Sequence, residues 1–196
     1  MAGVSGGSGW RALPYAAVIS AGNLWNPGVE HGQMHSAKRD QFAAIHREAA
    51  ENQERIYQML AGADLAGVSA ENLMRAHQRA KVTHENNADG HSAKARGYAE
   101  AAEIYTAVES KINSIVVDAH ERISKLKGSE AQREAAKAVI LAEAMEDYQR
   151  TYAMGEADML AAGQAMLAGM ARAHGREVQS IHSHFTPHGS TPKIQA

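Results

Sequence analysis

Proline is absent from residues 28 to 186, and this absence is the strongest constraint on the fold of the 196-residue chain. The prolines, Pro14, Pro27, Pro187 and Pro192, all lie toward the two ends. A proline inside a helix removes a backbone hydrogen bond and clashes with the preceding turn. The absence of proline from residues 28 to 186 therefore permits long helices in this region. β-branched residues are scarce and no long period-two alternation occurs. The sequence therefore predicts an all-α protein.

Apolar residues recur at three- and four-residue steps along three segments, which predicts three long helices. We expect the first to end near Leu60, the second to run from about Ser69 to Leu126, and the third to begin at Glu130. The apolar face expected in the first helix is Phe42, Ile45, Ala49, Ile56, Met59 and Leu60. The near-heptad pattern is strong in the second helix after Tyr98 and weak before residue 85.

Two short segments separate these helices. "AGADLAGV" ends the first, and either Asp64 or Ser69 is suited to cap the second. In "KLKGSEAQ", Gly128 suits a left-handed position after a helix, and Ser129 with Gln132 forms a capping-box pattern. Residues 85–91, "ENNADGH", weaken a helix, so a kink or break there stays open.

The predicted architecture is an elongated up-down-up bundle: a helical hairpin plus a third long helix. Residues 1–25, with their glycine- and serine-rich start, are expected to form a flexible N-terminal arm. Residues 26–183 form the bundle, and residues 184–196 are expected to be a disordered C-terminal tail.

Composition excludes several kinds of partner. A net charge of −2 gives no overall attraction to nucleic acid or to an anionic membrane. No apolar run reaches the roughly 18 residues of a membrane span, so membrane contact is not expected.

The N-terminus lacks the basic region of a cleavable signal peptide. There is no cysteine, which excludes disulfides and thiol chemistry.

Eleven histidines raise the question of a metal site. His77, His84 and His91 repeat every seven residues, about 10 Å apart along a helix, which is too far for two of them to share one ion. His31 and His35 lack a third ligand, and the cluster His182, His184 and His188 lies near the C-terminus. No nucleophile, phosphate-loop or dinucleotide motif occurs. We therefore expect no catalytic residues, no metal and no cofactor.

Methionines are frequent in the third predicted helix. Met145, Met159, Met166 and Met170 follow one face. Methionine fills irregular cores, but it also forms adaptable surfaces for partner helices. These four residues are therefore either core filler or a candidate seam for a helical partner or a homo-oligomer.

The first two helices and the turn between them carry a family resemblance. Leu65-Ala66-Gly67 stands where a Trp-x-Gly turn would stand, and "YTAVE", Tyr105 to Glu109, matches a Tyr-x-x-x-Asp/Glu pattern. Over residues 30–127 the chain resembles the WxG hairpin proteins and their PE, PPE and EspB-like relatives. These are substrates of the type VII (ESX) secretion systems of actinobacteria. Leu65 replaces the diagnostic tryptophan, and the tyrosine pattern occurs again from Tyr152 to Glu156.

The resemblance implies a non-enzymatic helical protein that pairs with another helical hairpin. It also implies that Tyr105 and Glu109 form part of an export signal, exposed as one epitope to a secretion ATPase or chaperone. The protein would then be secreted or held in the cell envelope. Alternatives are a structural assembly component of the virion kind and a cytoplasmic helical adaptor. Tyr105 is alternatively a packed seam residue and Glu109 a solvated charge.

Overall fold

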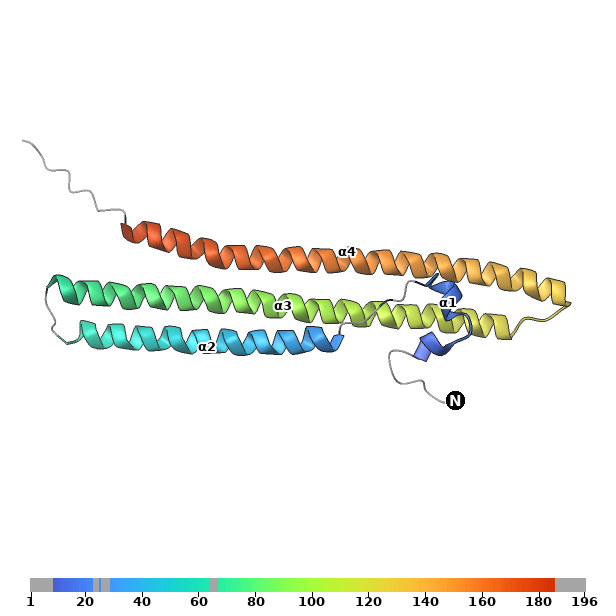
Figure 1. Cartoon of the computed structure of the whole chain (residues 1–196), viewed down its shortest axis with the longest axis horizontal. Coiled ribbons are helices and arrows are strands. Elements are labelled where there is room, and N and C mark those ends of the chain that lie inside the picture. Colours follow the sequence, from blue (N-terminus) through green and yellow to red (C-terminus); the bar gives the residue numbers. More distant parts are fainter. Residues whose placement is uncertain (1–8, 23–24, 26–28, 64–66, 186–196) are drawn as a thin grey trace, which may run out of the picture. The chain divides into compact units, whose positions relative to one another are not determined.

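The computed structural model of the chain is built from helices (Figure 1). It describes residues 9–22, 25, 29–63 and 67–185, with side chains as far as residue 175. The elements are a 3-10 helix, η1 (Gly9–Ala12), and the α-helices α1 (Ala16–Ile19), α2 (Val29–Ala61), α3 (Val68–Ser124) and α4 (Glu130–Phe185). These residues contain no strand, so the all-α prediction with three long helices is confirmed.

The turn between α2 and α3 lies where the sequence predicts it. α2 ends at Ala61, and Gly67 takes a φ of 104° just before α3 begins at Val68. This left-handed conformation suits glycine because a side chain would be strained there. The other candidate turn residue, Leu65, lies outside the described residues.

α3 continues without a break for 57 residues, through the segment where the sequence left a kink open. Asn86 and Ala88 are buried in this stretch, with 6% and 2% of their surfaces exposed. Tertiary packing therefore outweighs the low helix propensity of the local sequence.

The predicted capping box at the start of α4 is confirmed. Gln132 N–H donates to Ser129 Oγ at 3.4 Å, and Ser129 N–H donates to Gln132 Oε1 at 3.0 Å. The φ of Gly128 is 115°, as predicted for a left-handed glycine. However, α3 ends at Ser124, so Gly128 belongs to the connecting loop and does not directly follow the helix.

The described chain divides into two compact units. Unit 1 comprises residues 1–34 and 98–164, and unit 2 comprises residues 35–97 and 165–196. At the C-terminus, α4 extends to Phe185, slightly beyond the predicted start of the tail at residue 184. Residues 186–196 lie outside the described part of the chain.

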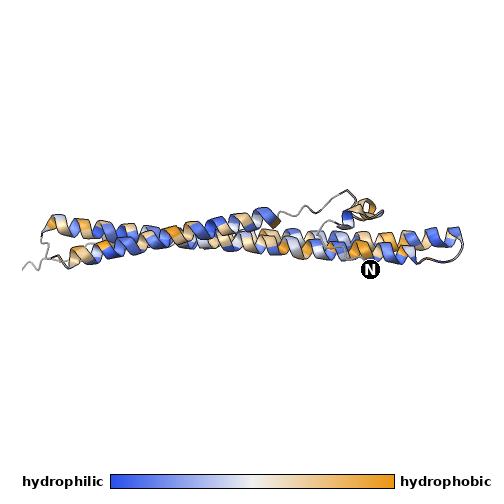
Figure 2. Cartoon of the chain, turned by 90° about the horizontal axis from the view of Figure 1, so that it is seen from below, coloured by the Kyte–Doolittle hydropathy of each residue, from blue (hydrophilic) through white to orange (hydrophobic). Residues whose placement is uncertain are grey.

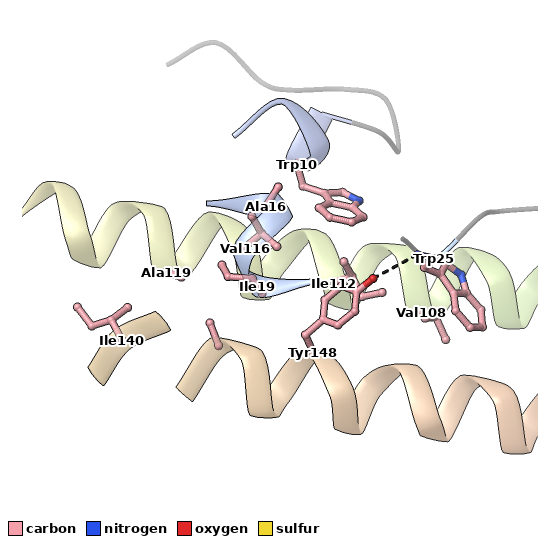
Figure 3. Packing of buried hydrophobic residues seen from close by; sticks show 11 residues of the cluster. Trp10, Ala16, Ile19, Trp25, Val108, Ile112, Val116, Ala119, Ile140 and Tyr148 are labelled. Carbon is pink, nitrogen blue, oxygen red and sulfur yellow. Dashed lines mark hydrogen bonds between the residues drawn. The ribbon is translucent and has the colours of Figure 1, made fainter. Parts of the chain in front are cut away.

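The core of unit 1 includes part of the segment predicted to be a flexible arm. Trp10 of η1 and Ile19 of α1 are fully buried against α3 and α4 (Figure 3). Residues 9–22 lie within the segment expected to be an arm, and their large apolar side chains complete this core. Residues 1–8 lie outside the described chain. The other buried members of the cluster are Ala16, Trp25, Val108, Ile112, Val116, Ala119, Ile140, Ala144 and Tyr148.

Unit 2 has a thinner core, and α2 buries a different face from the one predicted. Ala43 and Ala50 are buried, whereas Ile45 and Met59 are 59% and 75% exposed. Polar and apolar residues are interspersed along the helices (Figure 2). The predicted face was wrong because alanines and polar side chains make the contact with α3. The large apolar side chains exposed on α2 within this unit are Phe42, Ile45, Ile56 and Met59.

Candidate functional site

Glu109, one of the two candidate export residues, is buried in unit 1 with only 5% of its surface exposed. Trp10 Nε1 donates a hydrogen bond to Glu109 Oε1 at 2.9 Å, and Arg11 Nη2 lies 3.4 Å from Glu109 Oε2. A buried carboxylate is costly unless it is paired and hydrogen-bonded, and these two residues supply both kinds of partner. The N-terminal segment therefore covers and neutralises Glu109.

Arg11 connects this carboxylate to the next part of the N-terminal segment. Its Nη2 also donates to the backbone carbonyl of Trp25, and its guanidinium lies 5.3 Å from the centre of the Trp10 ring. Arg11 thus contacts three groups at once. It holds the tryptophans on either side of α1 against α3.

The two tyrosines of the repeated Tyr-x-x-x-Glu pattern both contact Trp25. The ring of Tyr105 on α3 lies 5.4 Å from it, and the ring of Tyr152 on α4 lies 5.3 Å from it, edge to face. Pairs at these distances contribute about 0.5–1.5 kcal/mol each beyond their buried area. The indole of Trp25 therefore links α3 and α4.

Tyr148 anchors the backbone of the same tryptophan. Its hydroxyl oxygen accepts a hydrogen bond from Trp25 N–H at 3.2 Å, drawn as a dashed line in Figure 3. Burial raises the pKa of Tyr148 above its ordinary value, and the Trp25 hydrogen bond opposes that rise in part. Its hydroxyl therefore stays neutral over the physiological pH range.

Close packing at Gly155 of α4 makes room for Trp25. A Cβ built on Gly155 would lie 2.8 Å from Trp25 Cη2 and 2.8 Å from Val108 Cγ2. Only a residue without a side chain leaves this space open. Gly155 therefore permits close contact between α4 and Trp25.

The expectation that Tyr105 and Glu109 form one exposed epitope is wrong for the folded chain. Tyr105 is half-buried beneath Trp25, and Glu109 lies beneath Trp10. The alternative of a solvated Glu109 is also wrong, whereas Tyr105 is a packed seam residue. Sequence reasoning missed the covering residues Trp10, Arg11 and Trp25. The presence of both tryptophans of the chain in a 16-residue stretch was the available signal.

The four methionines of the candidate partner seam are all half-buried. In unit 1, Met159 packs against the hydrophobic cluster. In unit 2, the side chain of Met166 lies so close to Gly97 that a Cβ there would be 2.8–2.9 Å from it. These contacts match the interpretation of Met159 and Met166 as core filler. A partner for Met145 or Met170 stays a prediction.

Histidines line the contact between α2 and α3 in unit 2. His46 Nδ1 and His84 Nδ1 lie 3.0 Å apart, so one nitrogen donates and the other accepts. The His91 ring stacks on His46 with 5.5 Å between centroids, and His77 Nδ1 lies 2.6 Å from Gln53 Oε1. The side chains of His77, His84 and His91, which are spaced seven residues apart, therefore face α2.

His91 is the member of this row with a perturbed titration. Burial lowers its pKa below the usual 6.5, and the positive charges of Lys94 and Arg39, with His46, lower it further. Its Nδ1 is buried and has no hydrogen-bond partner among the described residues. The neutral ring is therefore the form that this packing accommodates.

No group of three or more His, Cys, Asp or Glu side chains within the described ranges is arranged to hold a metal ion. The histidines near the C-terminus fall outside the described side chains. No helix of the described chain has the length and apolar character required to cross a membrane.

No protein-family model, curated protein or solved structure matches the chain significantly.

Proposed function

We propose that this chain is a non-enzymatic helical protein that acts by associating with other proteins and is exported by a type VII secretion system. One observation supports the proposal that the chain associates with other proteins. Large apolar side chains of α2 are exposed, whereas alanines and polar side chains of α2 make the contact with α3. Exposed apolar patches on a helix are typical of interaction sites. The export half of the proposal is supported by the resemblance at Tyr105 and Glu109.

In this proposal the N-terminal segment controls access to the export residues. Because Trp10 covers Glu109 and Trp25 covers Tyr105, a secretion component would bind the pair only after residues 9–25 move aside. The described part of this segment, residues 9–22 and 25, has no long helix of its own, so its release leaves the backbone hydrogen bonds of α3 in place and costs less than unfolding α3. A chaperone that binds the released form would shift that equilibrium.

The test is an export assay in an ESX-competent host with Tyr105→Ala and a matched control, Tyr152→Ala. Both tyrosines contact Trp25 at nearly the same distance, so both variants lose similar packing. We expect Tyr105→Ala to abolish export and Tyr152→Ala to leave it largely intact. Equal secretion of the wild type and both variants would refute the export role. Equal losses of export and thermal stability in both variants would show that Tyr105 only packs the seam.

A further inference from the structure

Four large apolar side chains lie exposed along α2 within unit 2. Phe42 and Ile56 are each 38% exposed, and Ile45 and Met59 are exposed by more than half. The side of α2 that contacts α3 carries Ala43, Ala50 and the polar residues His46 and Gln53. The apolar side chains therefore form a second face that is largely exposed, and Phe42 at its edge also contacts the His91 ring of α3, with 5.3 Å between the ring centroids.

The exposed face follows a heptad repeat. Phe42, Ala49 and Ile56 are seven residues apart, and Ile45, Asn52 and Met59 follow each of them by three. This is the spacing of the two apolar positions in a coiled-coil seam. We call these six residues the α2 seam. A single asparagine in such a seam restricts the register and the number of helices that can pair.

We propose that the α2 seam binds the α2 seam of a second copy of this chain, with the two helices antiparallel. This inference deepens the proposed association function by naming its partner, and it does not depend on export.

The seam is self-complementary in the antiparallel arrangement. With a two-fold axis between residues 50 and 51, Phe42 of one copy meets Met59 of the other, and Ile45 meets Ile56. Ala49 then meets Asn52 at the centre, where a small side chain leaves space for a polar one. Every layer occurs twice by symmetry, and the four outer layers are fully apolar. Burying them supplies the favourable free energy of association.

Charges beside the seam favour the same arrangement. Glu48 and Arg55 flank it on one side, seven residues apart. In the antiparallel register, Glu48 of each copy lies opposite Arg55 of the other, which gives two ion pairs across the interface. A parallel register would place these residues beside Gln53 and Leu60 of the second copy and leave both charges unpaired. Arg55 now donates to Asn52 of its own helix, an exposed contact that an intermolecular pair can replace.

Charge reversal tests the register directly. We expect light scattering and sedimentation to find a wild-type dimer. Glu48→Arg or Arg55→Glu alone places like charges opposite each other twice, which raises the dissociation constant about tenfold. The double variant restores pairing. An equimolar mixture of the two single variants also restores it, because one chain then carries only positive and the other only negative residues at these positions.

Apolar substitutions test the seam itself. Ile45→Ser removes a contact from both outer isoleucine layers and should raise the dissociation constant roughly a hundredfold. The matched control is Leu73→Ser on α3, which is 46% exposed and lies outside the seam. Both sites are exposed, so circular dichroism should find helicity unchanged.

A wild-type monomer at high concentration would overturn the proposal, as would a dimer that is insensitive to Ile45→Ser and to both charge reversals. Single reversals that weaken the dimer without rescue in the mixture would overturn the antiparallel register. These measurements use purified protein, so their failure is distinct from a failure of export in the host.

Discussion

Trp10 Nε1 donates a hydrogen bond to Glu109 Oε1 across 2.9 Å, joining residues that lie 99 positions apart in the sequence. The indole is fully buried and the carboxylate nearly so. This bond fixes η1 to the middle of the α3 segment of unit 1. The same carboxylate is one of the two residues that the family resemblance assigns to export, so the proposed export role falls on a side chain that packing already uses.

Glu109→Ala should therefore destabilise the protein, in contrast to a change at a solvated glutamate. It leaves the buried Trp10 N–H without an acceptor and removes the counter-charge of Arg11. We expect a loss of about 2–4 kcal/mol in the free energy of unfolding, measured by chemical denaturation. Glu109→Gln keeps an acceptor oxygen and should cost less.

Glu156→Ala is the matched control for this change, because Glu156 ends the second copy of the tyrosine pattern and is exposed on α4. Its unfolding free energy should stay within about 0.5 kcal/mol of the wild type. Equal stability of Glu109→Ala and Glu156→Ala would show that the Trp10 hydrogen bond does not contribute to folding.

Substitution by alanine at two glycines of α4 should change the stability of the protein in opposite directions. A Cβ at Gly155 would lie 2.8 Å from Trp25 and from Val108, whereas a Cβ at Gly163 meets nothing within 4 Å. Gly155→Ala should cost about 1–3 kcal/mol through overpacking. Gly163→Ala should raise the stability by up to roughly 1 kcal/mol, because alanine is the better helix former. Thermal unfolding measures both, and a stabilised Gly155→Ala would contradict the close contact with Trp25.

The sequence predicted the helices and the α3–α4 turn because both are encoded locally. Proline placement, periodicity and the Ser129–Gln132 capping box are short-range signals, and each is visible in the structure. The candidate export residues Tyr105 and Glu109 lie on α3, within the second predicted helix. Their burial could not be predicted, because it depends on Trp10 and Trp25, which reach them across about eighty or more residues of chain.

The face of α2 was predicted wrongly for a different physical reason. Periodicity identifies an apolar stripe but not the surface that covers it. The facing part of α3 presents histidines, and α2 turns the polar side chains of His46 and Gln53 toward them. Ala43 and Ala50 are buried on α2. The apolar stripe of Phe42, Ile45, Ile56 and Met59 is real as a pattern, and the described fold leaves it exposed.

Protonation of His91 should weaken the folded state as the pH falls. Burial lowers its pKa from 6.5, so below about pH 6.5 the unfolded chain binds a proton that the folded chain resists. The contribution of His91 to stability is therefore fully present above that pH and is lost as the pH falls toward the lowered value. Lys94 of α3 and Arg39 and His46 of α2 act in the same direction.

We expect the melting temperature of the wild type to decrease between about pH 7.5 and 5. His91→Phe keeps a ring beside Phe42 but cannot titrate, so it should reduce this slope, whereas substitution of the exposed His31 by glutamine should not. Parallel pH profiles for the wild type and His91→Phe would show that His91 does not cause the pH dependence.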